Sequence, residues 1–278
     1  MITRRTLLAL PATLYAAEPK VATPAYNTLS DAEEIALGRK FAATLEKDLP
    51  ILSVSALDNY VNGILTELAR KSRRPNIPYI AKVANTVDVN AISLPGGFVF
   101  VYRGLLEMVK TESELAAVLS HEVGHIVGRH SANNLMLDFR ARQVYEIVKR
   151  NLELRNTVIE EIIEKLGGPL VILARLRYSR ELEFESDLLG HYNMLRANWD
   201  PAGMVSFFKR LSLSRKDPGD WVDSALATHP DPAERAQRIQ AEIDGSRLPS
   251  GLTTNTMSFG AMKLGLKLLP APVRPKAK

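Results

Sequence analysis

Residues 115–127 read LAAVLSHEVGHIV, an apolar pattern at helical spacing that carries two histidines four positions apart, His121 and His125. The pattern predicts a helix that runs from Thr111 to about His130. Residues four apart lie on one face of a helix, so both imidazoles can reach one metal ion. The stretch therefore predicts a metal-binding helix.

Glu122, which follows the first histidine, points about 100° round the helix from it. There its carboxylate can reach a water at the metal without being a ligand itself. Zinc is the expected metal, because imidazole and carboxylate ligands suit it and the chain has no cysteine. A catalytic zinc site needs three protein ligands, so the two histidines leave one ligand to find.

A later stretch, RELEFESD at residues 180–187, offers that ligand in Glu181, Glu183 or Glu185. Only Glu183 has an acidic residue four positions on, in Asp187. Such a pair puts a ligand carboxylate and a carboxylate that orients a ligand histidine on one helix face. We therefore expect Glu183 to be the third ligand; the alternative is a solvated charge cluster without a metal.

Two further histidines have simpler interpretations. His130 lies nine residues after His121, which would place it on the opposite side of the same helix, in a structural or exposed position. His191 lies four residues after Asp187, and we expect it to have a packing role; the alternative is that it faces the site.

The chain has 278 residues, 46% of them hydrophobic and 24% charged, which is typical of a globular protein of one or two domains. The lack of cysteine excludes a thiol nucleophile, a zinc–thiolate site, an iron–sulfur cluster and a lipoprotein anchor. Without two arginines near the N-terminus and five basic residues near the C-terminus, the chain contains 29 basic and 31 acidic residues. The rest of the chain is thus nearly neutral and lacks the excess of basic residues that nucleic-acid-binding proteins show, so no nucleic-acid partner is expected.

The N-terminus predicts a signal peptide at residues 1–17, with Arg4 and Arg5 before a short apolar stretch and Ala16 and Ala17 for cleavage. The alternative is an N-terminal helix that is not removed. No segment has the length and apolar character of a membrane span. We therefore expect a periplasmic or secreted protein, with export through either the general or the twin-arginine route.

The rest of the pattern predicts an α+β, mainly helical fold with a small β-sheet beside the metal-binding helix. Expected strands cover residues 77–85, 87–94 and 98–102, and further expected helices cover residues 57–69, 135–166 and 170–197. The stretch 135–166 either packs on the body, or covers the cleft or touches a partner or membrane surface. The domain expectation is a linker at 18–30, a catalytic domain at 31–249 and a C-terminal extension at 250–278, whose last nine residues are disordered.

Four blocks of the sequence resemble the zinc metallopeptidases of the HtpX and BepA kind, metallopeptidase family 48, which also contains the CAAX prenyl proteases. Together they span about residues 90–240, in the order of the family. The blocks are Asn90-Ala91 with Pro95-Gly96-Gly97 and the following strand, the motif from His121 to His125, Tyr178-Ser179-Arg180 through Glu183 to Asp187 and Gly190, and Thr228-His229-Pro230 with Arg235.

The resemblance implies a gluzincin fold with His121, His125 and Glu183 as ligands of one zinc ion and Glu122 as general base. It also implies that His229 lies close to the metal. There His229 would bind zinc in a resting form or steady the transition state.

Arg235 matches the family's arginine after the fourth block, although Ala236-Gln237 departs from the usual continuation; with Asp187 it would support the ligands. The resemblance further suggests that Gly97–Tyr102 is the edge strand of the cleft, where an extended peptide adds a strand through main-chain hydrogen bonds. A strand buried within the sheet is the alternative. The candidate substrate-binding residues are Asn90, which also suits a turn, and Gly96, Gly97, Phe98 and Val99.

These observations predict a zinc metalloendopeptidase that hydrolyses peptide bonds of unfolded or misassembled envelope proteins. Outer-membrane assembly partners are expected from the resemblance alone, and a peripheral membrane contact is expected as one role of the amphipathic stretch 135–166. One alternative is a latent, zinc-bound chaperone or assembly factor in which His229 or a covering segment blocks the fourth metal position. Another is an amidase or deformylase, which the blocks around Glu183 and His229 disfavour.

Overall fold

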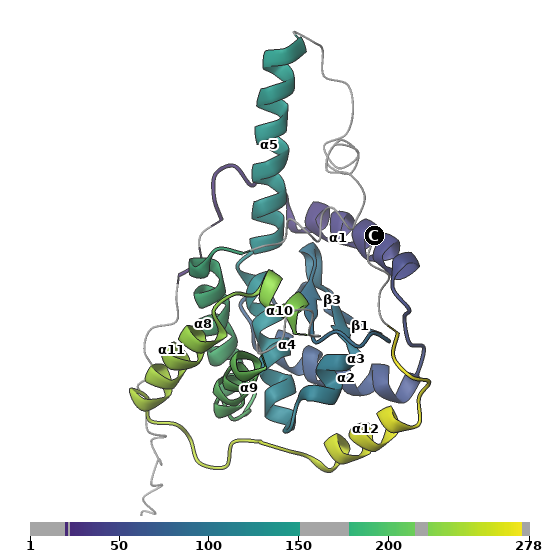
Figure 1. Cartoon of the computed structure of the whole chain (residues 1–278). Helices are drawn as coiled ribbons and strands as arrows, with labels where there is room; N and C mark the ends of the chain where they lie inside the picture. Colours follow the sequence, from purple (N-terminus) through teal and green to yellow (C-terminus); the bar gives the residue numbers. More distant parts are fainter. Residues whose placement is uncertain (1–19, 22, 151–177, 215–221, 274–278) are drawn as a thin grey trace, which may run out of the picture.

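The computed structural model in Figure 1 describes residues 20–21, 23–150, 178–214 and 222–273, without the side chains of residues 141–150 and 224. The predicted signal peptide at residues 1–17 lies outside the described residues. The far part of the helix predicted over residues 135–166 also lies outside them.

The described part of the chain is mainly helical, with one small sheet, which confirms the predicted fold class. Its elements are α1 (Asp31–Asp48), α2 (Ser55–Arg70), β1 (Ile80–Ala84), β2 (Ala91–Ser93), the 3-10 turn η1 (Pro95–Gly97), β3 (Phe98–Tyr102), α3 (Arg103–Met108), α4 (Glu112–Val127), α5 (His130–Arg150), α8 (Arg180–Arg196), α9 (Ala202–Leu213), α10 (Asp223–Thr228), α11 (Pro232–Asp244) and α12 (Met257–Lys267).

Helix α4 is the central element of this arrangement. It contacts α2, α8, α9 and β2, and all sixteen of its residues are buried. In Figure 1 the sheet lies on one side of α4, whereas α8, α9 and α11 lie on its other side. A helix buried on every side accounts for the apolar run around the His-Glu-x-x-His motif.

Side chains with hydroxyl groups begin the two helices that carry the predicted metal ligands. Thr111 caps α4, because its hydroxyl oxygen accepts a hydrogen bond from the backbone N–H of Glu114. Ser179 caps α8 in the same way, by accepting from the N–H of Leu182. The predicted helix 170–197 therefore begins at Arg180, and residues 170–177 lie outside the description.

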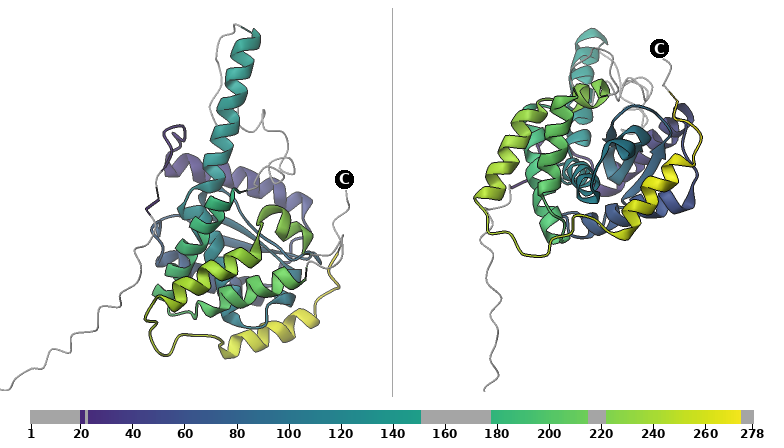
Figure 2. Two further views of the ribbon diagram at one scale, coloured as in Figure 1. Left: turned by 60° about the vertical axis from the view of Figure 1, so that its left-hand side comes forward. Right: turned by 60° about the horizontal axis from the view of Figure 1, so that its bottom comes forward.

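Helix α4 ends at Val127, and α5 begins at His130. Between them Arg129 has a φ of 56°, a left-handed backbone conformation that breaks the helix. The prediction that His130 lies on the same helix as His121 is therefore wrong. Figures 1 and 2 show that α5 then extends away from the body of the structure.

The sheet has the strand order β1-β3-β2. β3 pairs in parallel with β1, Ala81 opposite Val99, and antiparallel with β2, Ile92 opposite Phe100. The suggestion that Gly97–Tyr102 is an edge strand is therefore wrong, because both sides of β3 are already paired. Within the described residues, the strand with a free edge beside α4 is β2.

β3 is buried on both faces. Val99 and Val101 pack into a large core with α2, α4, α9 and α12. Phe98, Phe100 and Tyr102 face a second core, which the sheet shares with α1 and α5. Alternate residues of a strand point to opposite faces, so the run FVFVY fills both cores.

The described C-terminal residues pack against the rest of the chain. Phe259, Met262 and Leu266 of α12 join the large core. The expected disorder of the last nine residues is wrong for residues 270–273, because the N–H of Val273 donates to the carbonyl of Asn85 at 2.9 Å; residues 274–278 lie outside the description. The domain boundary at residue 249 stays a prediction.

No helix in the described ranges combines the length and the apolar character that crossing a bilayer requires.

Candidate metal centre

Four side chains that can bind a metal come together at α4. They are His121 and His125 of α4, Glu183 of α8 and His229, which follows α10. All four are buried, and one ligand atom of each lies within 4.8 Å of the others. The cluster is compatible with a gluzincin site.

The ligand atoms converge on one point. His125 Nε2 lies 2.9 Å from His121 Nε2 and 3.3 Å from Glu183 Oε1. The same carboxylate oxygen lies 3.0 Å from His229 Nδ1. Three imidazoles and one carboxylate at these separations match the donor types that zinc prefers.

A close helix crossing brings Glu183 to the two histidines of α4. A Cβ atom added to Gly124 would lie 2.5 Å from the carbonyl oxygen of Ser186, so only glycine allows this approach. The hydroxyl of Ser186 donates to the carbonyl of His121 at 2.6 Å. The glycine within the His-Glu-x-x-His motif thus sets the distance between α4 and α8.

Asp187 and Arg235 contact two of the candidate ligands, His121 and Glu183. Asp187 Oδ1 lies 2.8 Å from His121 Nδ1. The guanidinium of Arg235 donates to both oxygens of Asp187 at 2.7 Å, and its Nη1 lies 2.7 Å from Glu183 Oε2. This buried network fixes the ring of His121 and the carboxylate of Glu183 relative to each other.

Glu122 lies beside the cluster. Its Oε1 is 3.7 Å from His229 Nε2. Its Oε2 is buried and has no hydrogen-bond partner among the described residues. A buried carboxylate oxygen without such a partner is suited to bind a water.

The sequence interpretation missed the part that His130 takes in the site. Its Nδ1 lies 2.8 Å from His125 Nδ1, and its Nε2 lies 3.4 Å from Glu185 Oε2. Gly128 makes room for this ring, because a Cβ there would lie 2.2 Å from His130 Nε2. The glycine just after the apolar run is the sequence signal that indicates the break of the helix.

Tyr178 also belongs to the site. Its ring stacks on His125 at 3.9 Å between centroids and 21° between planes. Its hydroxyl lies 2.7 Å from the hydroxyl of Ser131 at the start of α5. The stacked ring closes one side of the metal centre.

Burial lowers the pKa of His125 well below its ordinary value, and the nearby His121 acts in the same direction. Burial by itself raises the pKa of Glu183, but the charges of His229, Arg235 and His121 outweigh it and hold this pKa well below its usual range. His125 is therefore neutral and Glu183 ionised at neutral pH. Metal ligands need these protonation states.

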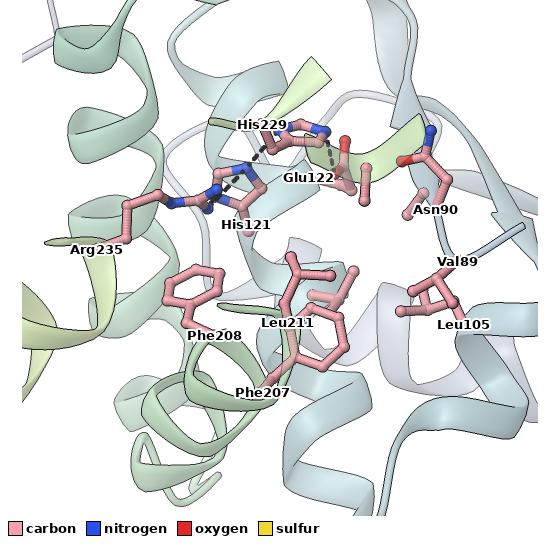
Figure 3. A pocket seen from close by; sticks show the side chains of 13 residues that line it. Val89, Asn90, Leu105, His121, Glu122, Phe207, Phe208, Leu211, His229 and Arg235 are labelled. Atoms are coloured by element: carbon pink, nitrogen blue, oxygen red, sulfur yellow. Dashed lines mark hydrogen bonds and ion pairs between the residues drawn. The ribbon is translucent and has the colours of Figure 1, made fainter. Parts of the chain in front are cut away.

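A pocket opens next to the cluster. In Figure 3 the side chains of His121, Glu122, His229 and Asn90 lie along one side of it, and apolar side chains lie along the other. The apolar lining comes from the segment around β2 and from α3, α4, α9 and α10; its members are Val89, Ala91, Leu105, Val118, Phe207, Phe208, Leu211 and Ala225.

Only one of the five candidate substrate-binding residues lines this pocket. Asn90 does so, and its Oδ1 is buried without a hydrogen-bond partner among the described residues. Gly96 and Gly97 instead approach the backbone of α1 and of the loop before β1. Phe98 and Val99 are buried in the two cores.

The family model described as Peptidase family M48 matches residues 55–243. The putative beta-barrel assembly-enhancing protease of Vibrio cholerae is 26% identical over 224 residues, which cover 78% of this chain and 45% of the relative. The mitochondrial metalloendopeptidase OMA1 of Schizosaccharomyces pombe is 30% identical over 181 residues, which cover 65% of this chain and 51% of the relative. The metalloprotease YcaL of Escherichia coli is 27% identical over 229 residues, which cover 78% of this chain and 82% of the relative. The chain thus spans about half the length of the first two relatives.

Proposed function

The chain belongs to peptidase family M48 and is a metallopeptidase, and on this premise we propose that it is a zinc-dependent endopeptidase of unfolded or misassembled envelope proteins. The cluster of His121, His125 and Glu183 carries the proposal, together with Glu122 Oε2, which has no hydrogen-bond partner among the described residues. The donor types, their burial and the converging ligand atoms support zinc as the metal.

In this proposal His121, His125 and Glu183 hold the zinc ion. The bound ion supplies a Lewis acid that polarises the scissile carbonyl and makes a water more acidic. Glu122 Oε2 accepts the proton of the attacking water and delivers it to the leaving amine. His229, which lies 3.7 Å from Glu122, donates to the oxygen of the tetrahedral transition state.

We place the substrate between β2 and the pocket. β2 has the free edge beside α4, so an extended peptide can add a strand there instead of at β3. Asn90, just before β2, offers its unpartnered side-chain oxygen to a peptide N–H. The apolar pocket takes an apolar side chain next to the scissile bond.

Cleavage of casein by the full chain tests this function. We expect a zinc chelator to stop cleavage and added zinc to restore it. Glu183→Gln is expected to lose zinc and cleavage, because a neutral amide oxygen is a weaker ligand than a carboxylate. Glu181→Gln, an exposed position on the same helix, serves as the control and should keep both. Full zinc binding and cleavage in Glu183→Gln would contradict the assignment.

His229 also favours a second candidate, a latent zinc-bound chaperone or assembly factor. Its Nδ1 lies 3.3 Å from His121 Nε2 and 3.0 Å from Glu183 Oε1, so it can take the fourth metal position. In a latent protein His229→Ala raises casein cleavage. In a working peptidase that uses His229 in the transition state, the same variant lowers it.

The envelope substrates are proposed from the name of the Vibrio cholerae relative and from the predicted signal peptide. Fractionation of cells that express the chain with a C-terminal tag tests the location. We expect periplasmic protein that begins after Ala16 or Ala17. Uncleaved protein in the cytoplasm would exclude an envelope role.

A further inference from the structure

Helix α12 has two apolar faces, and the described part of the chain covers one of them. Phe259, Met262 and Leu266 pack into the large core. On the other side Met257, Leu264 and Leu268 are 96%, 63% and 81% exposed. Residues at i, i+7 and i+11 follow one line along a helix, so these three form an exposed apolar row.

A groove runs beside this row, between α12 and α2. It encloses about 440 Å³, and its lining includes Leu57 and Tyr60 of α2 and Met262 and Gly265 of α12. Figure 2 shows α12 at the periphery of the structure, on its lower side. Row and groove together make an exposed apolar surface larger than scattered single residues give.

Within the described residues, the chain around this surface carries more basic than acidic groups. Residues 245–273 contain Arg247, Lys263 and Lys267 and no acidic residue, and Glu107, the carboxylate near Lys263, is paired with Arg103. Lys267 is exposed at the end of the apolar row. Lys263 is already engaged, because its ammonium donates to the carbonyls of Leu106, Glu107 and Val109.

We propose that the exposed row of α12 binds an anionic phospholipid surface, with Met257, Leu264 and Leu268 in the region between headgroups and acyl chains. Basic residues next to an apolar helix face are the combination that such a surface attracts. A second copy of the chain fits less well. It would bring the cations of the described residues 245–273 together without an acidic residue of that segment to pair with them.

Sedimentation with vesicles tests the proposal on the full chain. We expect binding to vesicles of phosphatidylcholine and phosphatidylglycerol in equal parts, little binding to phosphatidylcholine alone, and weaker binding at high salt. The double variant Leu264→Gln and Leu268→Gln should bind the anionic vesicles about tenfold less, because each loses apolar area at the surface. Lys267→Gln should weaken binding by a smaller factor.

Leu213→Gln is the matched control, since Leu213 is 69% exposed on α9, away from this surface. It should bind like the unchanged chain. All variants keep the predicted signal segment, so any contribution of that segment cancels in the comparison.

Three results would overturn the proposal. The chain could show no preference for anionic vesicles, or the double variant could bind them as tightly as the unchanged chain. Light scattering could also show a dimer that the double variant loses, which would assign the row to a second copy.

Discussion

His130 Nδ1 lies 2.8 Å from His125 Nδ1, although the two residues belong to different helices. One of these nitrogens has to donate and the other to accept. His125 turns its Nε2 toward Glu183 and His121. The arrangement in which its Nδ1–H donates to His130 therefore leaves Nε2 free for a metal, and the break between α4 and α5 orients the proposed ligand His125.

Replacement of His130 should weaken metal binding. We expect His130→Phe to lower zinc affinity about 10- to 100-fold, the range found for groups that orient metal ligands. Competition with a chelator of known affinity measures it. In His130→Asn the side-chain oxygen can still accept from His125, so this variant should keep most of the affinity. Unchanged affinity in His130→Phe would show that His125 needs no orienting partner.

Zinc binding should depend on the close crossing of α4 and α8 at Gly124 as strongly as on the proposed ligands. In Gly124→Ala the added Cβ meets backbone atoms of Ser186, so the helices must separate and move Glu183 away from the histidines. We expect a loss of zinc binding and a free energy of unfolding lower by about 1–3 kcal/mol.

Gly63→Ala in α2 provides the control for this change. A Cβ there meets no atom within 4 Å, and alanine is the better helix former. Urea unfolding should show unchanged or slightly raised stability for Gly63→Ala. A Gly124→Ala protein with normal zinc content would mean that the helices do not need this contact.

His191 should make the stability of the chain depend on pH. Burial lowers its pKa from 6.5 to about 4, and neither ring nitrogen has a hydrogen-bond partner among the described residues. Between these values the unfolded chain binds a proton that the folded chain does not, so stability falls as pH drops from 6.5 to about 4. The full effect is about 3 kcal/mol.

Urea unfolding across this pH range, compared between the unchanged chain and His191→Leu, measures the contribution. Leucine has no charge to gain, so the variant should lose less stability on acidification. Identical pH profiles would show that His191 is hydrated or paired in solution.

The helix that carries His121 and His125 could be predicted from the sequence because its signal is local. Its apolar pattern and the spacing of His121 and His125 fall within four turns of helix. Glu183 could also be singled out from the sequence as a candidate ligand, since the acidic Asp187 lies one turn further along the same helix.

Other parts of the structure depend on contacts between distant residues. The end of α4 depends on Arg129, whose side chain donates to Glu34 in α1 at 2.8 Å. The central place of β3 in the sheet depends on its pairing with β1 on one side and β2 on the other. The unbroken apolar run of β3 was compatible with an edge strand and with a strand buried within the sheet, and the structure shows the buried alternative. Family resemblance alone favoured the edge.

The measurement closest to the central claim compares Glu122→Gln with the unchanged chain for zinc content and casein cleavage together. Glu122 lies beside the cluster and is not one of its four members, and its Oε2 is the group that takes the proton of the attacking water in the proposed mechanism. We predict equal zinc content and cleavage reduced to background in the variant. Retained cleavage at equal zinc content would contradict the claim that Glu122 is the general base.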